Sequence, residues 1–329
     1  MLALPVHSER VPQAADPLVL TVVIDTEEEF DWAASFDPAQ TSVHNIGFQP
    51  LAQRIFDKHG VIPTYVVDYP VATTPASINV LREFADAGRC EIGAHLHPWV
   101  NPPAEERVNT FHSYASNLPG DLMRRKLEVL TAAIEQGFGR KPLVYKAGRY
   151  GVGPGTPEVL AALGYAVDAS VVPHTSFAAD GGPDFQGLPD SPFLIQPGLV
   201  EMPLSVHYAG RLASLGSTLY PALMGGMARR LRLPGILARL GLLERLRLSP
   251  EGHTLADMIR QTRMALASGA RTLMLTYHSS TLMPGSTPYT RTEQQRDDFL
   301  TTLDEYLTFF TALRHARTST VTEAAAAFQ

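Results

Sequence analysis

The sequence predicts an α/β fold built from parallel strands that alternate with helices. Residues 18–24 (Leu-Val-Leu-Thr-Val-Val-Ile) indicate a buried strand, and the amphipathic residues 47–59 indicate a helix that ends at Gly60. Acidic residues follow this first strand, and two histidines lie at the end of a later apolar run. Functional residues at the carboxyl ends of parallel strands are typical of α/β barrels.

The first half of the chain repeats this alternation with short connections, which favours parallel β-α units. The second strand is followed by Asp68, and the second helix ends at Gly88, a residue that commonly terminates helices. The elements expected here are strands at 18–24, 61–67 and 89–94 and helices at 47–59 and 75–87.

The second half continues the pattern after a long polar loop at residues 100–119. The alternation is interrupted between residues 174 and 203, which are rich in Pro, Gly and Asp and contain two short apolar runs. The expected elements are strands at 142–147, 165–168, 193–195, 199–202 and 271–276 and helices at 121–136, 156–163, 254–267, 292–313 and 321–328.

Residues 205–252 differ from the rest in composition, because leucine and methionine are interleaved with arginine. This pattern predicts a helical, Leu/Arg-rich insertion. Two explanations fit it: helices that pack an apolar face on the barrel, or a basic amphipathic surface that contacts a membrane or a lipid-like substrate. We favour packing on the barrel, since a buried helical face requires the same pattern.

The overall composition describes an ordinary globular protein. The chain has 329 residues, of which 45% are hydrophobic and 18% charged, and its formal net charge of -6 argues against a general nucleic-acid binder. Cys90 is the only cysteine, which excludes an intrachain disulfide framework and a thiolate zinc site. We see no secretory signal or membrane-spanning window, so the expected location is the cytoplasm.

The strongest functional pattern is the pair His95 and His97. Alternate residues of a strand face the same side, so both imidazoles can point at one object. Carboxylates are available at Glu27, Glu28 and Glu29, directly after the first strand. Two histidines and a carboxylate are a common ligand set for catalytic zinc. Structural histidines and a solvated acidic loop are the simpler alternatives.

Three segments together resemble the polysaccharide deacetylase superfamily, also known as the NodB-homology fold or carbohydrate esterase family 4. They are residues 25–32 (Asp-Thr-Glu-Glu-Glu-Phe-Asp-Trp), 95–99 (His-Leu-His-Pro-Trp) and 277–289 (Tyr-His-Ser-Ser-Thr-Leu-Met-Pro-Gly-Ser-Thr-Pro-Tyr), and the divergent WalW-type branch is the most similar. The resemblance implies a distorted, seven-stranded β/α barrel, formed by a single domain at residues 17–329 with residues 205–252 inserted. It also implies a divalent metal, usually zinc, and removal of acyl groups from amino sugars.

The resemblance also implies a metal site. The family's first motif is an Asp-Asp pair, of which the first is a general base and the second a metal ligand. Asp25 matches the base, but Thr26 stands at the ligand position, so the ligand role would pass to Glu27. The family's metal-binding histidines are four residues apart, whereas His95 and His97 are two apart. The longer carboxylate of Glu27 would compensate for this shift.

The remaining catalytic roles are implied in the same way. Arg149 matches the family's arginine, which holds the base Asp25 ionised. His278 matches the histidine acid that protonates the departing amine, and Asp168 is expected to be its partner. The expected activity is metal-dependent removal of an acyl group, most simply N-acetyl, from a saccharide or glycan precursor.

Two other functions are compatible with the sequence. Asp25 with Glu27 or Glu28 could form the acid and base pair of a glycoside hydrolase, which needs no metal. The departures at Thr26 and in the histidine spacing would also fit a catalytically inactive relative that only binds glycans.

Overall fold

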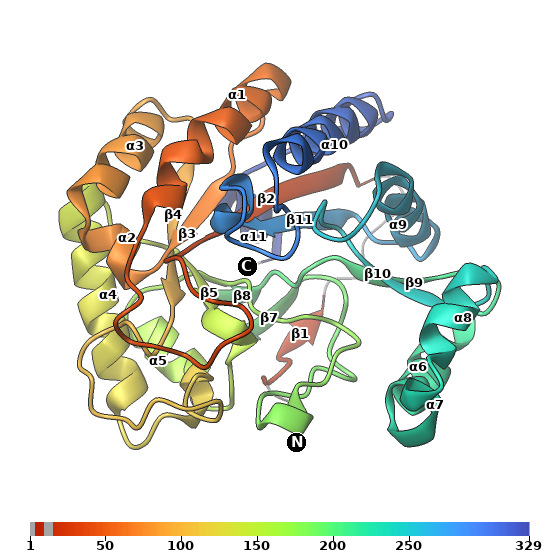
Figure 1. Ribbon diagram of the computed structural model, residues 1–329, viewed down its shortest axis with the longest axis horizontal. Helices are drawn as coiled ribbons and strands as arrows, with labels where there is room; N and C mark the ends of the chain where they lie inside the picture. Colours follow the sequence, from red (N-terminus) through yellow and green to blue (C-terminus); the bar gives the residue numbers. More distant parts are fainter. Residues whose placement is uncertain (1–3, 10–15, 329) are drawn as a thin grey trace.

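A computed structural model describes residues 4–9 and 16–328 of the chain. It shows a mixed α/β architecture in which helices cover the outside of a curled sheet (Figure 1). The strands of this sheet are β1 (Ser8–Glu9), β2 (Leu18–Thr26), β3 (Thr64–Val67), β4 (Glu91–Leu96), β5 (Val144–Ala147), β6 (Val167–Asp168), β7 (Phe193–Gln196), β8 (Leu199–Glu201), β11 (Thr272–His278) and β12 (Ala316–Thr318).

Parallel pairing connects the strands in the order β11-β2-β3-β4-β5-β6-β8, as the β-α alternation predicted. Within residues 4–9 and 16–328 the sheet has ten strands rather than the expected seven, because β1 and β7 extend one edge antiparallel and β12 pairs with the start of β2. Next to β11 lie two residues from outside the sheet: Ser205 Oγ accepts from the Met274 N–H at 2.8 Å, and the Leu248 carbonyl accepts from the Thr276 N–H at 3.2 Å.

Helices connect the parallel strands from β2 to β6, and local signals define the ends of these helices. Gly60 ends α1 with φ 64, in the left-handed region that glycine adopts without strain. Asp68 begins α2, a short helix that the sequence pattern did not predict, by accepting from the Val71 N–H at 2.8 Å. The helices around the sheet are α1 (Gln49–His59), α2 (Tyr69–Thr73), α3 (Pro75–Asp86), α4 (Leu122–Phe138), α5 (Thr156–Ala162), α9 (Leu255–Ala267), α10 (Glu293–Thr311) and α11 (Val321–Ala325).

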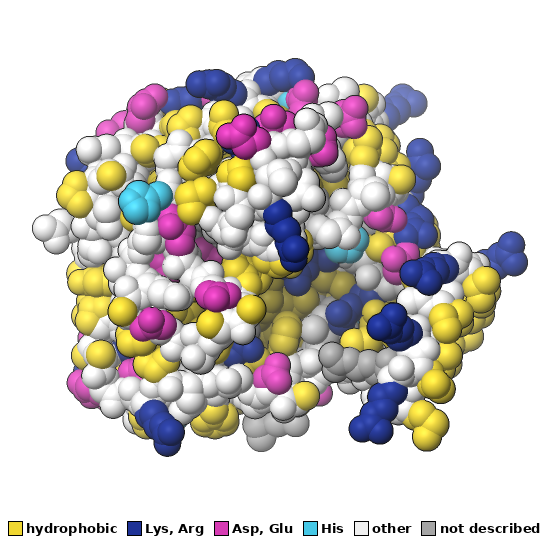
Figure 2. Space-filling model, viewed as in Figure 1, with side chains coloured by type: hydrophobic (Ala, Val, Ile, Leu, Met, Phe, Trp, Pro, Cys, Tyr) yellow, Lys and Arg dark blue, Asp and Glu magenta, His cyan; other side chains and the backbone are white. Residues whose placement is uncertain are grey.

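Within the segment at residues 205–252, a helical lobe formed by residues 211–240 projects from the barrel (Figure 1). Two antiparallel strands, β9 (Val206–Ala209) and β10 (Glu244–Arg247), connect the lobe to the barrel. Between them lie α6 (Gly216–Met224), α7 (Gly226–Arg230) and α8 (Leu233–Arg239). Lys and Arg side chains gather around the hollow between this lobe and the barrel (Figure 2). Within the described residues, no helix combines the length and apolarity needed to cross a bilayer.

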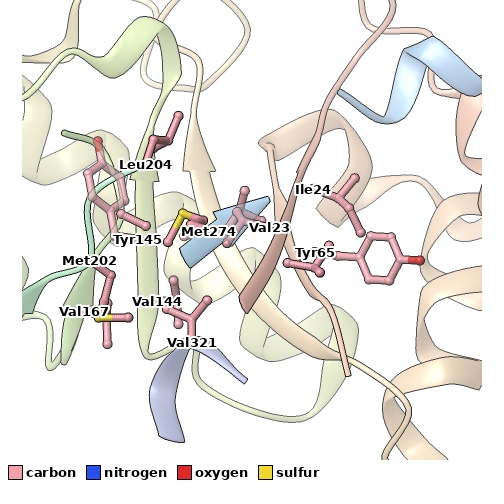
Figure 3. Packing of buried hydrophobic residues seen from close by; sticks show 14 of the residues in the cluster. Val23, Ile24, Tyr65, Val144, Tyr145, Val167, Met202, Leu204, Met274 and Val321 are labelled. Atoms are coloured by element: carbon pink, nitrogen blue, oxygen red, sulfur yellow. The ribbon is translucent and has the colours of Figure 1, made fainter. Parts of the chain in front are cut away.

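The core explains why the strand ends are held in fixed positions. All nine residues of β2 are buried, and apolar side chains of neighbouring strands pack around it (Figure 3). Val23, Tyr65, Val144 and Met274 are examples, each at most 1% exposed. Burying one such aliphatic side chain stabilises the fold by about 1.5–3 kcal/mol. A rigid apolar sheet therefore carries the polar residues at its carboxyl end.

Candidate active site

Strand register brings five of the predicted site residues to one end of the barrel. His278, the last residue of β11, is directly opposite Asp25 near the end of β2. Glu27 follows β2, and His95 and His97 lie at the end of β4. All five side chains line one cavity of about 330 Å³.

Glu27, His95 and His97 form a compact buried cluster. The Nε2 atoms of His95 and His97 lie 3.5 and 3.3 Å from Oε2 of Glu27. The three side chains can offer ligand atoms that all lie within 4.8 Å of one another. Oε1 of Glu27 is buried and has no hydrogen-bond partner among the described residues. This atom therefore has unused capacity to bind a cation.

Neighbouring groups orient both imidazoles. Nδ1 of His95 donates to the carbonyl of Lys146 at 2.9 Å, and Nδ1 of His97 lies 2.8 Å from Oε2 of Glu28. The other oxygen of Glu28 accepts from Nε1 of Trp99 at 2.8 Å. When Nδ1 carries the proton, a neutral imidazole presents Nε2 as the free ligand atom. These contacts direct both Nε2 atoms at the carboxylate of the cluster.

Thr26 takes no part in this cluster, because its hydroxyl donates to the carbonyl of Ile24 at 2.9 Å. A second group that could hold a metal consists of Glu28, Asp68 and His97. Its carboxylates are already engaged: Asp68 accepts from the Glu28 N–H at 2.6 Å, and burial together with the neighbouring Glu28 raises the pKa of Asp68. The cluster with the unpartnered carboxylate oxygen is the better metal site.

Asp25 is buried beside the cluster and paired with a lysine. Nζ of Lys146 donates to Oδ1 of Asp25 at 2.5 Å and to the hydroxyl of Thr276 at 3.1 Å. Burial alone would raise the pKa of Asp25, but the charges of Lys146, His95 and His278 outweigh it and lower this pKa. Asp25 is therefore ionised at neutral pH.

The structure corrects the prediction that Arg149 pairs with Asp25. Lys146, on β5, occupies that place. After β5 the backbone turns, with Arg149 in the left-handed region at φ 51, and the arginine points elsewhere. Its Nη1 donates to the hydroxyl of Ser113 at 2.5 Å, and its guanidinium lies 4.2 Å from the ring centre of Tyr114. Arg149 nevertheless lines the cavity.

His278 is held by Glu251, which the sequence did not single out. One carboxylate oxygen of Glu251 lies 2.9 Å from Nδ1 of His278, and the other accepts from its backbone N–H at 2.9 Å. Burial would lower the pKa of His278, but the charges of Glu251, Glu27 and Asp25 raise it to about 10. Nε2 of His278 lies 3.7 Å from Oδ2 of Asp25. The imidazolium therefore faces the cavity beside the ionised carboxylate.

Asp168 is not the partner of His278, contrary to the prediction. It lies on β6, and β5, β4, β3 and β2 separate β6 from β11 in the sheet. Its carboxylate accepts from the hydroxyl of Ser170, and burial raises the pKa of Asp168 to about 7. The neighbouring Glu201 is also buried, and its side chain shares a hydrogen bond with Asp168. The carboxylate partner of His278 is Glu251.

Aromatic side chains form the cavity wall. Trp32, from the loop after β2, lies edge-on to His278 with a ring distance of 4.9 Å. Its Nε1–H is buried and has no acceptor among the described residues. Tyr150 and Tyr289 complete this side, and Arg247 of β10 donates to the Tyr150 hydroxyl at 3.1 Å. The wall thus combines flat apolar rings with donors that a polar ligand could use.

No protein-family profile matches the chain, and no curated protein matches it. Solved structures do match its fold. A protein from Mycobacterium smegmatis described as a polysaccharide deacetylase is 19% identical with a TM-score of 0.56, over 99% of this chain and 94% of that one. Puue allantoinase is 13% identical with a TM-score of 0.55, over 97% and 93%.

A protein from Pseudomonas aeruginosa PAO1, also described as a polysaccharide deacetylase, is 12% identical with a TM-score of 0.51 over 94% of this chain and 89% of that one. Identities this low establish the fold alone. The matched structures are described as polysaccharide deacetylases in two cases and as an allantoinase in the third. The chain thus has the polysaccharide deacetylase fold, a mixed α/β architecture with a curled half-barrel sheet.

Proposed function

We propose that the chain is a metal-dependent hydrolase that removes an acyl group, most simply N-acetyl, from a saccharide or glycan precursor. The observation that carries the proposal is the cluster of Glu27, His95 and His97, which lines a cavity between an ionised carboxylate and a protonated histidine. The fold shared with proteins described as polysaccharide deacetylases supports the choice of substrate class.

The cluster fits a zinc ion chemically. Two imidazole nitrogens and one carboxylate are the ligand set of many catalytic zinc sites. Burial would lower the pKa of His97, but the charges of Glu28 at Nδ1 and Glu27 at Nε2 raise it, so the two carboxylates favour positive charge at this end of the cavity. Zinc held by Glu27, His95 and His97 would polarise the substrate carbonyl and lower the pKa of water.

The protein's own groups would move the protons. Asp25 would accept a proton from the attacking water, and its ion pair with Lys146 keeps it ionised until then. His278 would donate a proton to the departing amine as the C–N bond breaks. Glu251 holds Nδ1 of His278, so that Nε2 faces Asp25 and the cavity. The products are the free amine and the carboxylic acid, with one water consumed.

The test combines metal analysis with activity. We expect near-stoichiometric zinc in the purified chain, loss of zinc in Glu27→Ala, His95→Ala and His97→Ala, and retention in His112→Ala, a histidine outside the cavity lining. We also expect release of acetate from N-acetylated sugars to stop when a chelator removes the metal. Hydrolysis of glycosidic bonds that survives chelation would favour the glycoside hydrolase instead. Zinc binding with ligand binding but no hydrolysis would favour the inactive relative.

A further inference from the structure

The helical lobe, defined as residues 211–240, has an unusual charge distribution. No Asp or Glu occurs between Glu201 and Glu244, although the chain as a whole has a net charge of -6. The lobe contains five arginines. Four of them are exposed and form no ion pair with the described residues: Arg211, Arg230, Arg232 and Arg239.

The lobe also exposes large apolar side chains. Of the eleven exposed large hydrophobic residues in the described chain, seven lie in the lobe. Met227 is 76% exposed, and Leu231, four residues later, is 58% exposed. Leu240 is 64% exposed, four residues after Ile236. The remaining three are Leu215, Leu219 and Met224. Figure 2 shows apolar side chains along the outer edge of the lobe, next to basic ones.

These exposures argue against packing on the barrel as the explanation of the Leu/Arg-rich sequence. Helices that packed an apolar face on the barrel would bury it, but Gly216 is the only buried residue among the described side chains of 211–240. The helices α6, α7 and α8 pack mainly on one another and on β10. Seven exposed large apolar side chains on a basic helical element are typical of segments that lie in the interface of a membrane.

We propose that the lobe docks on a membrane surface that contains anionic lipids. The exposed Leu and Met side chains would enter the interfacial layer, and the arginines would pair with lipid phosphates and carboxylates. The charge pattern disfavours a second copy of the chain as the partner, because a two-fold contact through the lobe would bring arginines together without any acidic side chain of the lobe. The strand β10, which leads out of the lobe, also carries Arg247 in the cavity wall, so one strand connects the proposed docking surface with the cavity.

The test is co-sedimentation of the full chain with vesicles of phosphatidylcholine, alone or mixed with phosphatidylserine. We expect binding to the mixed vesicles only, weakened by salt. At about fivefold per arginine near an anionic surface, Arg230→Gln/Arg232→Gln should weaken binding roughly 30-fold. The triple variant Met227→Ser/Leu231→Ser/Leu240→Ser should abolish it. These side chains are exposed, so unchanged thermal unfolding is expected to confirm that the variants fold.

Matched controls lie outside the lobe. Arg54→Gln/Arg124→Gln removes two other exposed arginines without an ion pair in the described residues, and Leu143→Ser removes another exposed leucine. Both variants should bind mixed vesicles like the original chain. The proposal is overturned by absence of vesicle binding, by equal binding to both kinds of vesicle, or by equal effects of lobe and control variants. Light scattering that shows lobe-dependent dimers without vesicle binding would assign the surface to a second copy.

Discussion

Replacing Glu251 by Gln is the sharpest test of the proposed proton donor. The substitution keeps the shape of the side chain and removes the negative charge that lies 2.9 Å from Nδ1 of His278. Among the neighbouring charges, Glu251 contributes most to raising the pKa of His278 to about 10. Loss of one close opposite charge lowers the pKa of a base by about 1–3 pH units. The histidine should therefore lose its proton closer to neutral pH.

The sign of the effect on activity follows from the role of the histidine. As an acid, His278 is active only while protonated, so the rate should fall as pH rises through its pKa. In Glu251→Gln this alkaline limb of kcat/KM should move to lower pH by about 1–3 pH units. The same shift can be measured without a substrate, by NMR titration of the histidine ring signals. The spectrum of His278→Gln would identify the relevant signal among the 11 histidines.

Glu244→Gln is the matched control, because Glu244 pairs with Arg260 on the surface and does not line the cavity. In Glu244→Gln, the alkaline limb of kcat/KM and the NMR titrations of the histidines should be the same as in the original chain. The reasoning is refuted if His278 of the original chain titrates near the ordinary value of about 6.5. It is equally refuted if Glu251→Gln leaves the pKa of His278 unchanged.

Three further substitutions test the groups that position the site. Lys146→Met removes the closest cation from the buried carboxylate of Asp25, so unfolding by denaturant should show a loss of about 3–5 kcal/mol. Glu28→Gln weakens the support of His97 and should reduce zinc affinity about 10–100-fold in chelator competition. In Gly148→Ala the new Cβ would lie 2.3 Å from Cδ2 of His97, so zinc affinity should fall, whereas Gly155→Ala, with open space around it, should retain zinc.

Each of these tests has a contradicting result. Stability of Lys146→Met equal to that of the original chain would show that the ion pair is not needed by the fold. Unchanged zinc affinity in Glu28→Gln would mean that the histidine is oriented by other contacts. Equal zinc affinity in Gly148→Ala and Gly155→Ala would show that the histidine can move without loss of the site.

The fold could be predicted because its signals are local. Continuous apolar runs indicated the buried parallel strands, and helix ends such as Gly60 were visible in the sequence. Strands β9 and β10 were missed because their signal is not local: Glu244 pairs with Ala209 across the whole lobe. The residues of β10, Glu-Arg-Leu-Arg, are as compatible with a helix as with a strand. Only the tertiary pairing distinguishes the two.

The site residues that could be predicted are those at the carboxyl ends of strands. Asp25, His95 and His278 follow apolar strands, and parallel strands bring their carboxyl ends together. Glu251 lies in the connection between β10 and α9, and its contact with His278 depends on the tertiary fold of this connection. No local sequence signal indicates that contact. Lys146 was missed because it lies within the short buried strand β5. The sequence of a strand does not show which of its side chains faces an acidic partner on a neighbouring strand.

The electrostatics of the cavity also separate the proposed hydrolysis of an acyl group from glycoside hydrolysis. A glycosidase of this kind needs one carboxylic acid that stays protonated to serve as the proton donor. Burial would raise the pKa of both Asp25 and Glu27, but neighbouring charges and, for Glu27, hydrogen bonds lower both values, so both groups are ionised. The protonated group beside them is His278. A carboxylate base and an imidazolium acid 3.7 Å apart match the proton transfers of amide hydrolysis, whereas neither Asp25 nor Glu27 is the protonated carboxylic acid that the alternative requires.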